Sequence, residues 1–263
     1  MQSILSVSSG QLELWTTTFL WPFVRMLALF STAPVFGESW VPRQVKVGCA
    51  AMFALLLGPT LQIPSVPIVS VGGLWIIAQQ VIIGAAMGWT MRMVFAAVQA
   101  AGEYIGLQMG LSFASFYDPM SRGTTVVVAR LLNMLAMLIF LALDGHLLLI
   151  QALSDSFRTL PIADAPLAAN GWMVLALAGA RIFEHGLLLA LPLVTALLIL
   201  NMAMGILNRS APQFSVFSIG FPLTLLFGIG MLELLVPRLS AFLEPRIAQG
   251  IELLMQFTAA LHS

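Results

Sequence analysis

A serine and two histidines are the residues of this chain that come nearest to a catalytic arrangement. Ser112 stands in the tripeptide Gly110-Leu111-Ser112, and His146 or His185 could supply the base of a Ser/His dyad. Gly-x-Ser is a common tripeptide, however, and no sequence spacing brings either histidine to Ser112. The residues therefore give little support to a membrane-embedded protease.

Metal and phosphate chemistry are not indicated either. The histidines His146, His185 and His262 are dispersed, and the single cysteine, Cys49, lies in an apolar run without metal-ligand spacing. The chain has no Gly-x-x-x-x-Gly-Lys-[Ser/Thr] loop, so it cannot itself drive transport with ATP. We expect no catalytic residue, no metal and no cofactor, and we expect that the chain is not an enzyme.

One group of charged residues stands inside a long apolar stretch. Arg181, Glu184 and His185 are three and four residues apart, which places them on one helical face and allows Arg181 to pair with Glu184. A proton or ion relay is one interpretation. We favour a satisfied polar cluster at a helix interface, because one ion pair does not make a pathway.

Arg25 and Arg92 stand alone in their apolar segments. A charge inserted in lipid costs roughly 2.5–3.5 kcal/mol, so such residues usually face protein or water. Each arginine is expected to meet a carboxylate or helix-end carbonyls from elsewhere, and that partner could belong to another subunit. The alternative is that lipid does not surround these segments.

Composition indicates what kind of element carries these residues. Of 263 residues, 60% are hydrophobic and 8% are charged, whereas a soluble domain has about 25% charged residues. The formal net charge is zero, which gives no basic surface for nucleic acid. We predict an all-α integral membrane protein that contacts membrane lipid. No Lys or Arg precedes the first apolar stretch, so we do not expect a cleaved signal peptide.

Six stretches approach the roughly 20 apolar residues that a spanning helix needs. They are Leu14–Phe36, Val45–Leu61, Val71–Ala101, Val126–Leu153, Trp172–Gly205 and Phe214–Val236. No flexible linker separates them, so we expect a single domain that spans residues 1–263. If all six cross a membrane, the positive residues on its two sides are almost balanced and do not orient the chain.

Two of these stretches are longer than one span requires. Val71–Ala101 and Trp172–Gly205 exceed a hydrocarbon core of about 30 Å at about 1.5 Å per residue. They are either helical hairpins or helices that extend beyond the lipid. The tail from Arg246 to Leu261 is amphipathic and predicts a further surface or partner-facing helix.

Glycines recur every four residues at Gly102, Gly106 and Gly110, and again at Gly84 and Gly88. This spacing places each set on one helix face, where a second helix or subunit can approach closely. Helix packing is the predicted role of both sets.

A polar residue and an aromatic segment accompany the first glycine set. Glu103 lies beside the glycine face and would need burial against a partner. The segment Leu111-Ser112-Phe113-Ala114-Ser115-Phe116-Tyr117-Asp118-Pro119 is too apolar for an ordinary solvent loop. Non-helical backbone at membrane depth requires burial in protein or a hydrated cavity. A loop that projects into a pore and a plain buried turn are equally compatible with these residues.

Several short motifs are spread along most of the chain. They are Arg25 with Ala33-Pro34-Val35-Phe36-Gly37 and Val41-Pro42; Glu103, Gly106 and Gly110 with Asp118-Pro119; Asp144-Gly145-His146; and Gly205-Ile206-Leu207-Asn208-Arg209-Ser210-Ala211-Pro212-Gln213 with Phe217 and Ile219-Gly220-Phe221-Pro222. Together they resemble the FliR family of flagellar export-gate proteins, and the last block is the most specific. Many relatives have a second histidine where this chain has Leu147, which argues against chemistry by a histidine pair.

The resemblance implies a fold in which a FliP-like part is joined to a FliQ-like part, built of long bent helices and helical hairpins. It implies a hetero-oligomeric helical complex with FliP-like and FliQ-like subunits, in contact with an FlhB-like protein. Such a complex lies in the flagellar basal body at the bacterial inner membrane, and unfolded rod, hook and filament subunits pass through it. Asn208 and the Ile219–Thr224 ending favour the flagellar system over the injectisome.

For such a channel, we expect apolar side chains that close a dewetted constriction and yield to a passing polypeptide. Met109, Phe113, Phe116 and Tyr117 are the candidates for that constriction. A stand-alone small-solute secondary transporter is the alternative function. The chain shows neither the internal repeats nor the cluster of intramembrane carboxylates that would favour it.

A second hypothesis concerns the motif between the last two apolar stretches. Arg209 could pair across a subunit interface and Pro212 could fix the entry to the last long helix, whereas a plain solvated connection is the alternative. The residues with expected structural or interface roles are Arg25, Pro34, Arg181, Glu184, Arg209, Pro212, Gln213 and Pro222.

Overall fold

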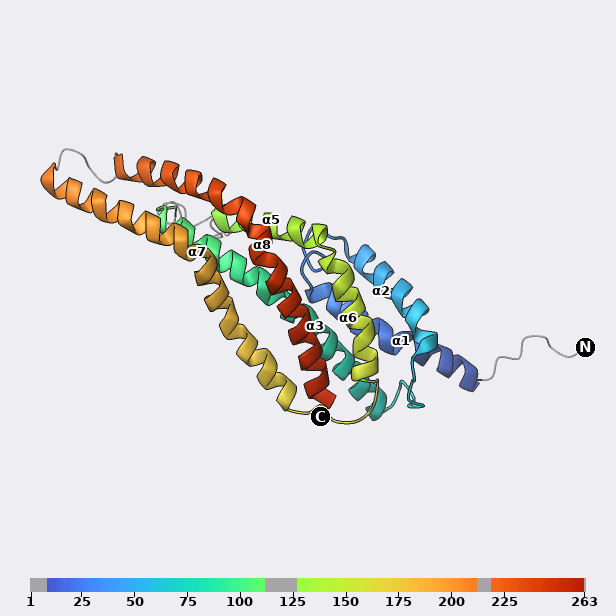
Figure 1. Cartoon of the computed structure of the whole chain (residues 1–263). Coiled ribbons are helices and arrows are strands. Elements are labelled where there is room, and N and C mark those ends of the chain that lie inside the picture. Colours follow the sequence, from blue (N-terminus) through green and yellow to red (C-terminus); the bar gives the residue numbers. More distant parts are fainter. Residues whose placement is uncertain (1–8, 112–126, 212–218, 263) are drawn as a thin grey trace, which may run out of the picture. The chain divides into compact units, whose positions relative to one another are not determined.

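The protein is helical throughout the part of the chain that the computed structural model describes, which is residues 9–111, 127–211 and 219–262 (Figure 1). Its elements are α1 (Ser9–Thr32), α2 (Arg43–Leu57), the 3₁₀ turn η1 (Gly58–Thr60), α3 (Val71–Gln108), α5 (Val127–Ala142), α6 (Gly145–Thr159), α7 (Asn170–Ser210) and α8 (Phe221–His262). The predicted all-α class is confirmed for these residues.

Three described helices, α3, α7 and α8, are long and apolar enough to cross a membrane, and α5 with α6 could make a fourth crossing as a broken pair. This number is smaller than the six apolar stretches in the sequence. Helices α1 and α2 account for the difference when α5 and α6 are counted as one crossing. An apolar stretch therefore does not by itself identify a lipid span in this protein.

The long stretches are single helices, so the hairpin alternative for Val71–Ala101 and Trp172–Gly205 was wrong. The tail from Arg246 is likewise no separate helix, because α8 runs through it without a break. The expected single stretch Val126–Leu153 is instead broken after Ala142. Asp144 has a φ of 54° there, a left-handed conformation that an α-helix cannot continue through.

Several prolines lie inside helices rather than at their ends. Pro22 lies inside α1, Pro192 inside α7, and both Pro237 and Pro245 inside α8. A proline removes one backbone hydrogen bond and normally ends or kinks a helix. Apolar helices packed against neighbours tolerate it, because local adjustments satisfy the freed carbonyls.

The described residues form two compact units. The first draws on Met1–Arg92, His146–Ala178 and Gln249–Ser263, and the second on Met93–Gly145 and Gly179–Ala248. Helices α3, α7 and α8 each contribute residues to both units. One domain over residues 1–263 stays a prediction.

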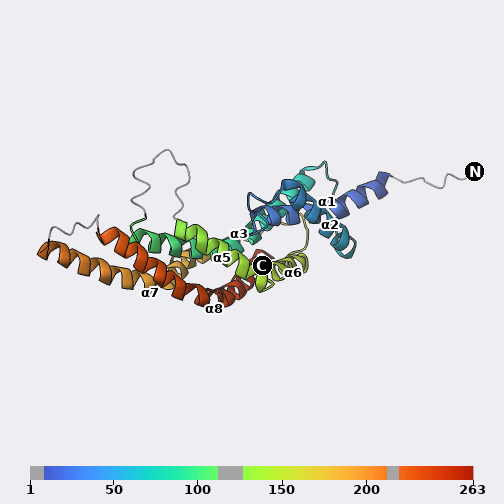
Figure 2. The ribbon, with the colours of Figure 1, turned by 90° about the horizontal axis from the view of Figure 1, so that it is seen from above.

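In the first unit, α3 packs closely onto α1. A methyl group added at Gly84 would lie 2.9 Å from Ala28 Cβ, and one at Gly88 would lie 2.8 Å from the backbone nitrogen of Ala33. The predicted packing role of Gly84 and Gly88 is therefore confirmed. Helix α2 also packs against α1 (Figures 1 and 2).

In the second unit, the last part of α3 is the centre on which α5, α7 and α8 pack. Gly102 of α3 approaches Ala129 of α5, Gly186 of α7 approaches Ala97, and Gly228 of α8 approaches Met109. Phe95 meets Phe140 of α5 edge to face at 5.5 Å. Glycines and alanines thus let helices pack at short axial distance, as in membrane proteins.

Candidate functional site

The first polar site lies at Arg25, whose side chain is completely buried between α1, α3 and α6. Its Nε donates a hydrogen bond to Gln80 Oε1 at 2.7 Å. Nη1 donates to the carbonyl and to the hydroxyl of Ser156, both at 3.2 Å, and Nη2 donates to the carbonyl of Leu160 at 3.1 Å. The guanidinium carbon lies 4.3 Å from the ring centre of Phe157.

These contacts identify the groups that meet the Arg25 side chain, which the sequence analysis left open. Helix-end carbonyls, one of the two expected partners, are confirmed, since the carbonyls of Ser156 and Leu160 lie at the end of α6. The negative end of a helix dipole and an aromatic face both favour a cation. Among the described residues, Arg25 therefore joins three helices through an amide, a hydroxyl and backbone carbonyls and without a carboxylate. Sequence reasoning missed Gln80, Ser156 and Phe157, because only folding brings them to Arg25.

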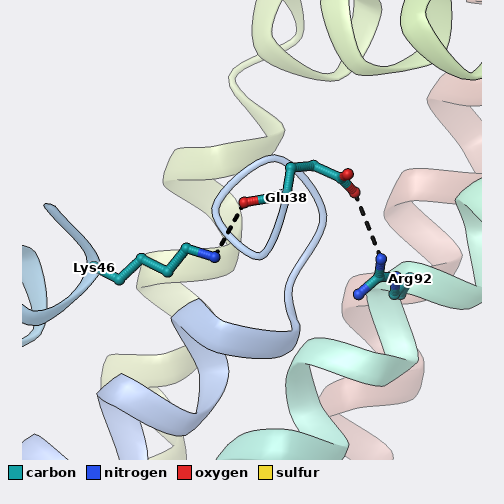
Figure 3. Close-up of polar contacts among 3 residues, drawn as sticks. All are labelled: Glu38, Lys46 and Arg92. Atoms are coloured by element: carbon teal, nitrogen blue, oxygen red, sulfur yellow. Dashed lines mark hydrogen bonds and ion pairs between the residues drawn. The ribbon is translucent and has the colours of Figure 1, made fainter. Parts of the chain in front are cut away.

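The second polar site joins Arg92 of α3 to the turn that follows α1 (Figure 3). Arg92 Nη2 lies 3.6 Å from Glu38 Oε1, and the two side chains are 46% and 24% exposed. Lys46 of α2 donates from Nζ to the carbonyl of Glu38 at 3.1 Å. The expectation that Arg92 meets a carboxylate from elsewhere is confirmed, and that carboxylate belongs to the same chain.

The turn that presents Glu38 has a tightly specified backbone. Pro34 is buried, and Val35 adopts a φ of 66°, which is strained for a β-branched residue. The backbone nitrogen of Gly37 donates to the carbonyl of Ala33 at 2.8 Å. The family-like block from Ala33 to Gly37 therefore reverses the chain and positions Glu38 for Arg92.

The charges of α7 do not form the expected pair. Arg181 and Glu184 are both exposed, and the ion pair recorded among the described residues is that of Arg92 with Glu38. His185, on the same face, is half-buried. Within the described residues, Arg181 and Glu184 thus form no ion pair with each other, and their role at an interface stays a prediction.

In the set Gly102, Gly106 and Gly110, the first two glycines are buried in the helix. A methyl group at Gly102 would lie 2.7 Å from the backbone nitrogen and 2.9 Å from Cβ of Ala129, so no larger residue fits between α3 and α5. Gly106 is also buried. Glu103, beside them, is exposed and accepts a hydrogen bond from Gln99 Nε2 at 3.2 Å.

Gly110 has a different role from the helix packing that its spacing suggested. Its φ is 80°, its backbone nitrogen donates to the carbonyl of Leu107 at 3.1 Å, and that of Leu111 donates to the carbonyl of Gly106 at 3.0 Å. This pair of bonds around a left-handed glycine is the Schellman motif. Gly110 ends α3.

The proposed constriction residues are mostly beyond the described structure. Phe113, Phe116 and Tyr117 lie outside the described residues, as does Ser112. Met109 is buried, its thioether packs on Gly228 of α8, and its carbonyl accepts a hydrogen bond from Thr224 Oγ1 at 3.5 Å. The structure thus places Met109 in the packing between α3 and α8.

The motif between α7 and α8 is described in part. Arg209 is exposed in the last turn of α7, where a cation complements the helix dipole. Pro212 and Gln213 lie outside the described residues. Pro222 is exposed in the first turn of α8, a position where proline costs no helical hydrogen bond.

No group of three metal-ligating side chains occurs within residues 9–111, 127–211 and 219–262. What the surface offers instead is a large apolar area. On α7 the residues more than 60% exposed include Leu177, Phe183, Ile199, Met202 and Ile206. Such an area is covered by lipid or by other proteins.

Comparison with known proteins decides between the possible classes. Residues 16–250 match the family described as bacterial export proteins, family 1. The chain belongs to this family. It is 48% identical over 260 residues to the flagellar biosynthetic protein FliR of Pectobacterium carotovorum subsp. carotovorum, covering 99% of this chain and 100% of that protein.

Two further relatives carry the same name. FliR of Escherichia coli (strain K12) is 49% identical over 258 residues, 98% of this chain and 99% of that protein. FliR of Bacillus subtilis (strain 168) is 29% identical over 218 residues, 81% of this chain and 84% of that protein. The resemblance to the FliR family is confirmed. The chain is a helical membrane protein of the flagellar export apparatus, with a structural or transport role.

Proposed function

We propose that the chain forms part of the wall of the flagellar protein-export channel in the bacterial inner membrane. Unfolded rod, hook and filament subunits pass through this channel. The chain assembles with FliP-like and FliQ-like subunits and contacts an FlhB-like protein, and it performs no catalysis.

The observation that carries this proposal is the mismatch between α7 and a bilayer. Its 41 residues make about 60 Å of helix when counted along the chain, roughly twice the hydrocarbon thickness. Apolar side chains are exposed from Leu177 to Ile206, with the exposed charges of Arg181 and Glu184 between them. Lipid cannot cover this whole length at an acceptable cost, so other protein subunits cover part of it.

The internal contacts suit a wall that keeps its shape while a polypeptide passes. The buried hydrogen bonds of Arg25 and the glycine contacts of Gly84, Gly88 and Gly102 fix helix positions without bulky intervening side chains. Phe113, Phe116 and Tyr117 remain our candidates for the constriction, together with Met109, which is buried against α8.

Mild-detergent purification of the chain from cells that express the flagellar genes, followed by mass measurement, tests the proposal. We expect a complex with several different apolar subunits, and loss of hook-protein export when the gene is deleted. Recovery of the chain alone, or only as copies of itself, from a strain that exports normally would contradict a channel-wall role. That outcome would instead favour a stand-alone transporter.

A further inference from the structure

A cavity of about 280 Å³ lies beside the end of α6, in the first unit. Its walls come from two segments that are far apart in the sequence. They are Thr60, Leu61 and Gln62 on one side, and Phe157, Arg158, Pro161 and Ile162 on the other. The proposed channel wall makes no use of this cavity.

Both walls are fixed on α1. A methyl group added at Gly58, the first residue of η1, would lie 2.6 Å from the carbonyl oxygen of Thr18, so η1 rests directly on the α1 backbone. The end of α6 is fixed by the hydrogen bonds that Arg25 of α1 donates to the carbonyls of Ser156 and Leu160. The space between the walls is therefore part of the packed structure of this unit.

Two side chains in the walls can donate hydrogen bonds to a ligand. Arg158 and Gln62 are exposed, and neither takes part in a hydrogen bond or ion pair recorded among the described residues. The hydroxyl of Thr60, by contrast, already donates to the carbonyl of Leu57 at 2.7 Å. A guanidinium is a fork of donors that fits a phosphate or carboxylate group.

A buried positive charge lies behind the α6 wall. The guanidinium carbon of Arg25 is 4.3 Å from the ring centre of Phe157, and Phe157 lines the cavity. Within the described part of the chain, the hydrogen-bond partners of Arg25 include no carboxylate. The carbonyls of Ser156 and Leu160, which carry the negative end of the α6 dipole, are already engaged by Arg25. The field in the cavity is therefore positive.

The nearest acidic side chains do not cancel this field. Asp155 lies on α6 three residues before Arg158, and Asp164 lies at the start of α3, where a methyl group added at Gly72 would be 3.0 Å from its Oδ2. Neither aspartate lines the cavity. Neither takes part in the ion pair recorded among the described residues. The cavity therefore favours an anion.

The rest of the lining is apolar and selects among anions. A free phosphate ion would leave Leu61, Pro161 and Ile162 against water, whereas a lipid headgroup covers them with its glycerol carbons. We propose that the cavity binds the headgroup of an anionic phospholipid, whose phosphate oxygens accept hydrogen bonds from Arg158 and Gln62. A headgroup with its own cation, such as phosphatidylcholine, is repelled by Arg158. This binding requires only a membrane and does not depend on the channel-wall role.

Protection of a cysteine in the wall tests the location. Leu61→Cys is made in the full chain with Cys49→Ser, which removes the single native cysteine. The chain, with the subunits that copurify, is placed in phosphatidylcholine vesicles with or without phosphatidylglycerol. We expect phosphatidylglycerol to slow alkylation of residue 61 by uncharged N-ethylmaleimide at least about fivefold, because the bound headgroup covers the site. Ser154→Cys is the control: it is half-buried on α6, does not line the cavity, and should react at one rate in both vesicles.

Neutralising Arg158 tests the recognition. In the Leu61→Cys chain, Arg158→Gln should raise the phosphatidylglycerol fraction that gives half-maximal protection about tenfold, because a charge-assisted hydrogen bond is lost. Arg43→Gln is the matched control, since Arg43 is an exposed arginine of the first unit that does not line the cavity. An unchanged rate at Ser154→Cys shows that the Arg158→Gln chain keeps its fold.

Equal alkylation of residue 61 with and without phosphatidylglycerol would overturn the proposal. So would the same half-maximal fraction for Arg158→Gln and Arg43→Gln. Inorganic phosphate, added to phosphatidylcholine vesicles, separates the two sources of a phosphate group. If it protects residue 61 as well as phosphatidylglycerol does, the cavity binds a free anion and the assignment to a lipid is wrong.

Discussion

Arg25 Nε donates a hydrogen bond to Gln80 Oε1 over 2.7 Å, between residues 55 positions apart in the chain. The guanidinium is wholly buried, and its described partners are an amide, a hydroxyl, two backbone carbonyls and an aromatic ring. A buried charge is stable only when hydrogen bonds replace its hydration. The relationship thus makes the positions of α1, α3 and α6 interdependent.

Replacing Arg25 with lysine should destabilise the first unit although the charge is kept. A lysine ammonium cannot reach Gln80, Ser156 and Leu160 together, because its three donors lie on one nitrogen. We expect the free energy of unfolding in detergent to fall by about 2–4 kcal/mol. The control is Arg158→Lys, an exposed position on α6, which should change it by less than about 0.5 kcal/mol. Equal effects of the two substitutions would contradict the role given to Arg25.

Two glycines should respond to alanine with opposite signs. At Gly102 the added methyl group collides with the backbone of Ala129, whereas at Gly205 of α7 it meets no atom within 4 Å. Gly102→Ala should lower the free energy of unfolding by about 1–3 kcal/mol, through overpacking. Gly205→Ala should raise it by about 0.5–1 kcal/mol, because alanine loses less backbone entropy in a helix. Chemical unfolding of both purified variants measures the difference, and a shared sign would show that α3 and α5 do not pack as described.

Gly110 should tolerate asparagine better than alanine. Its φ of 80° lies in the left-handed region, where a non-glycine residue costs roughly 1–2 kcal/mol and asparagine costs less than most. Gly110→Ala should therefore lower the unfolding free energy by about 1 kcal/mol, and Gly110→Asn by less. If Gly110 were mainly a helix-packing residue, the larger asparagine would be the more harmful change.

The ion pair of Arg92 and Glu38 should contribute little to the free energy of unfolding. Both side chains retain solvent contact and their atoms are 3.6 Å apart. A double-mutant cycle with Arg92→Gln and Glu38→Gln should give a coupling energy of about 0.2–1 kcal/mol. The coupling should fall as salt rises, because exposed charges are screened. A coupling above 2 kcal/mol that salt leaves unchanged would mean that a partner subunit buries this pair.

The sequence was sufficient for the class of fold and the family, and insufficient for the arrangement of contacts. Hydropathy located every long helix. A long apolar run that crosses a membrane forms an α-helix, because all its backbone hydrogen bonds are then made within the segment. Hydropathy failed at the ends of those helices: the expected stretch Phe214–Val236 stops short of α8, which continues through Pro237 and Pro245, whereas the break at Asp144 depends on one left-handed residue.

Pair contacts were harder to predict than helices. The sequence suggested a local partner for Arg181, because Glu184 is three residues away, and a partner from elsewhere for Arg92 that it could not identify. The structure leaves Arg181 exposed, whereas the turn after α1 brings Glu38 to Arg92. The four-residue spacing of Gly110 likewise suggested packing, although its backbone conformation makes it a helix end. Spacing identifies which residues can meet, but only the fold decides which do.

Substitution tests the hypothesis that the aromatic side chains of Phe113 and Phe116 close the idle channel. A closed channel must exclude ions and water when idle and still yield to an extended polypeptide, which apolar side chains achieve by dewetting. Replacing both Phe113 and Phe116 with alanine removes most of the aromatic bulk of that segment. We expect increased ion leak across the membrane, together with altered export of hook protein, at unchanged levels of the chain.

The control for this prediction is Phe183→Ala. Phe183 is an exposed aromatic residue of α7 and has no proposed role in closure, so its loss should not raise ion conductance. Leak is measured as growth inhibition and membrane depolarisation in cells that express the variant chain with the rest of the apparatus. Because dewetting depends on apolar surface rather than on one contact, Phe113→Leu with Phe116→Leu should retain most of the seal. Normal leak and normal export with both alanines would make these side chains ordinary packing residues and would remove them from the channel mechanism.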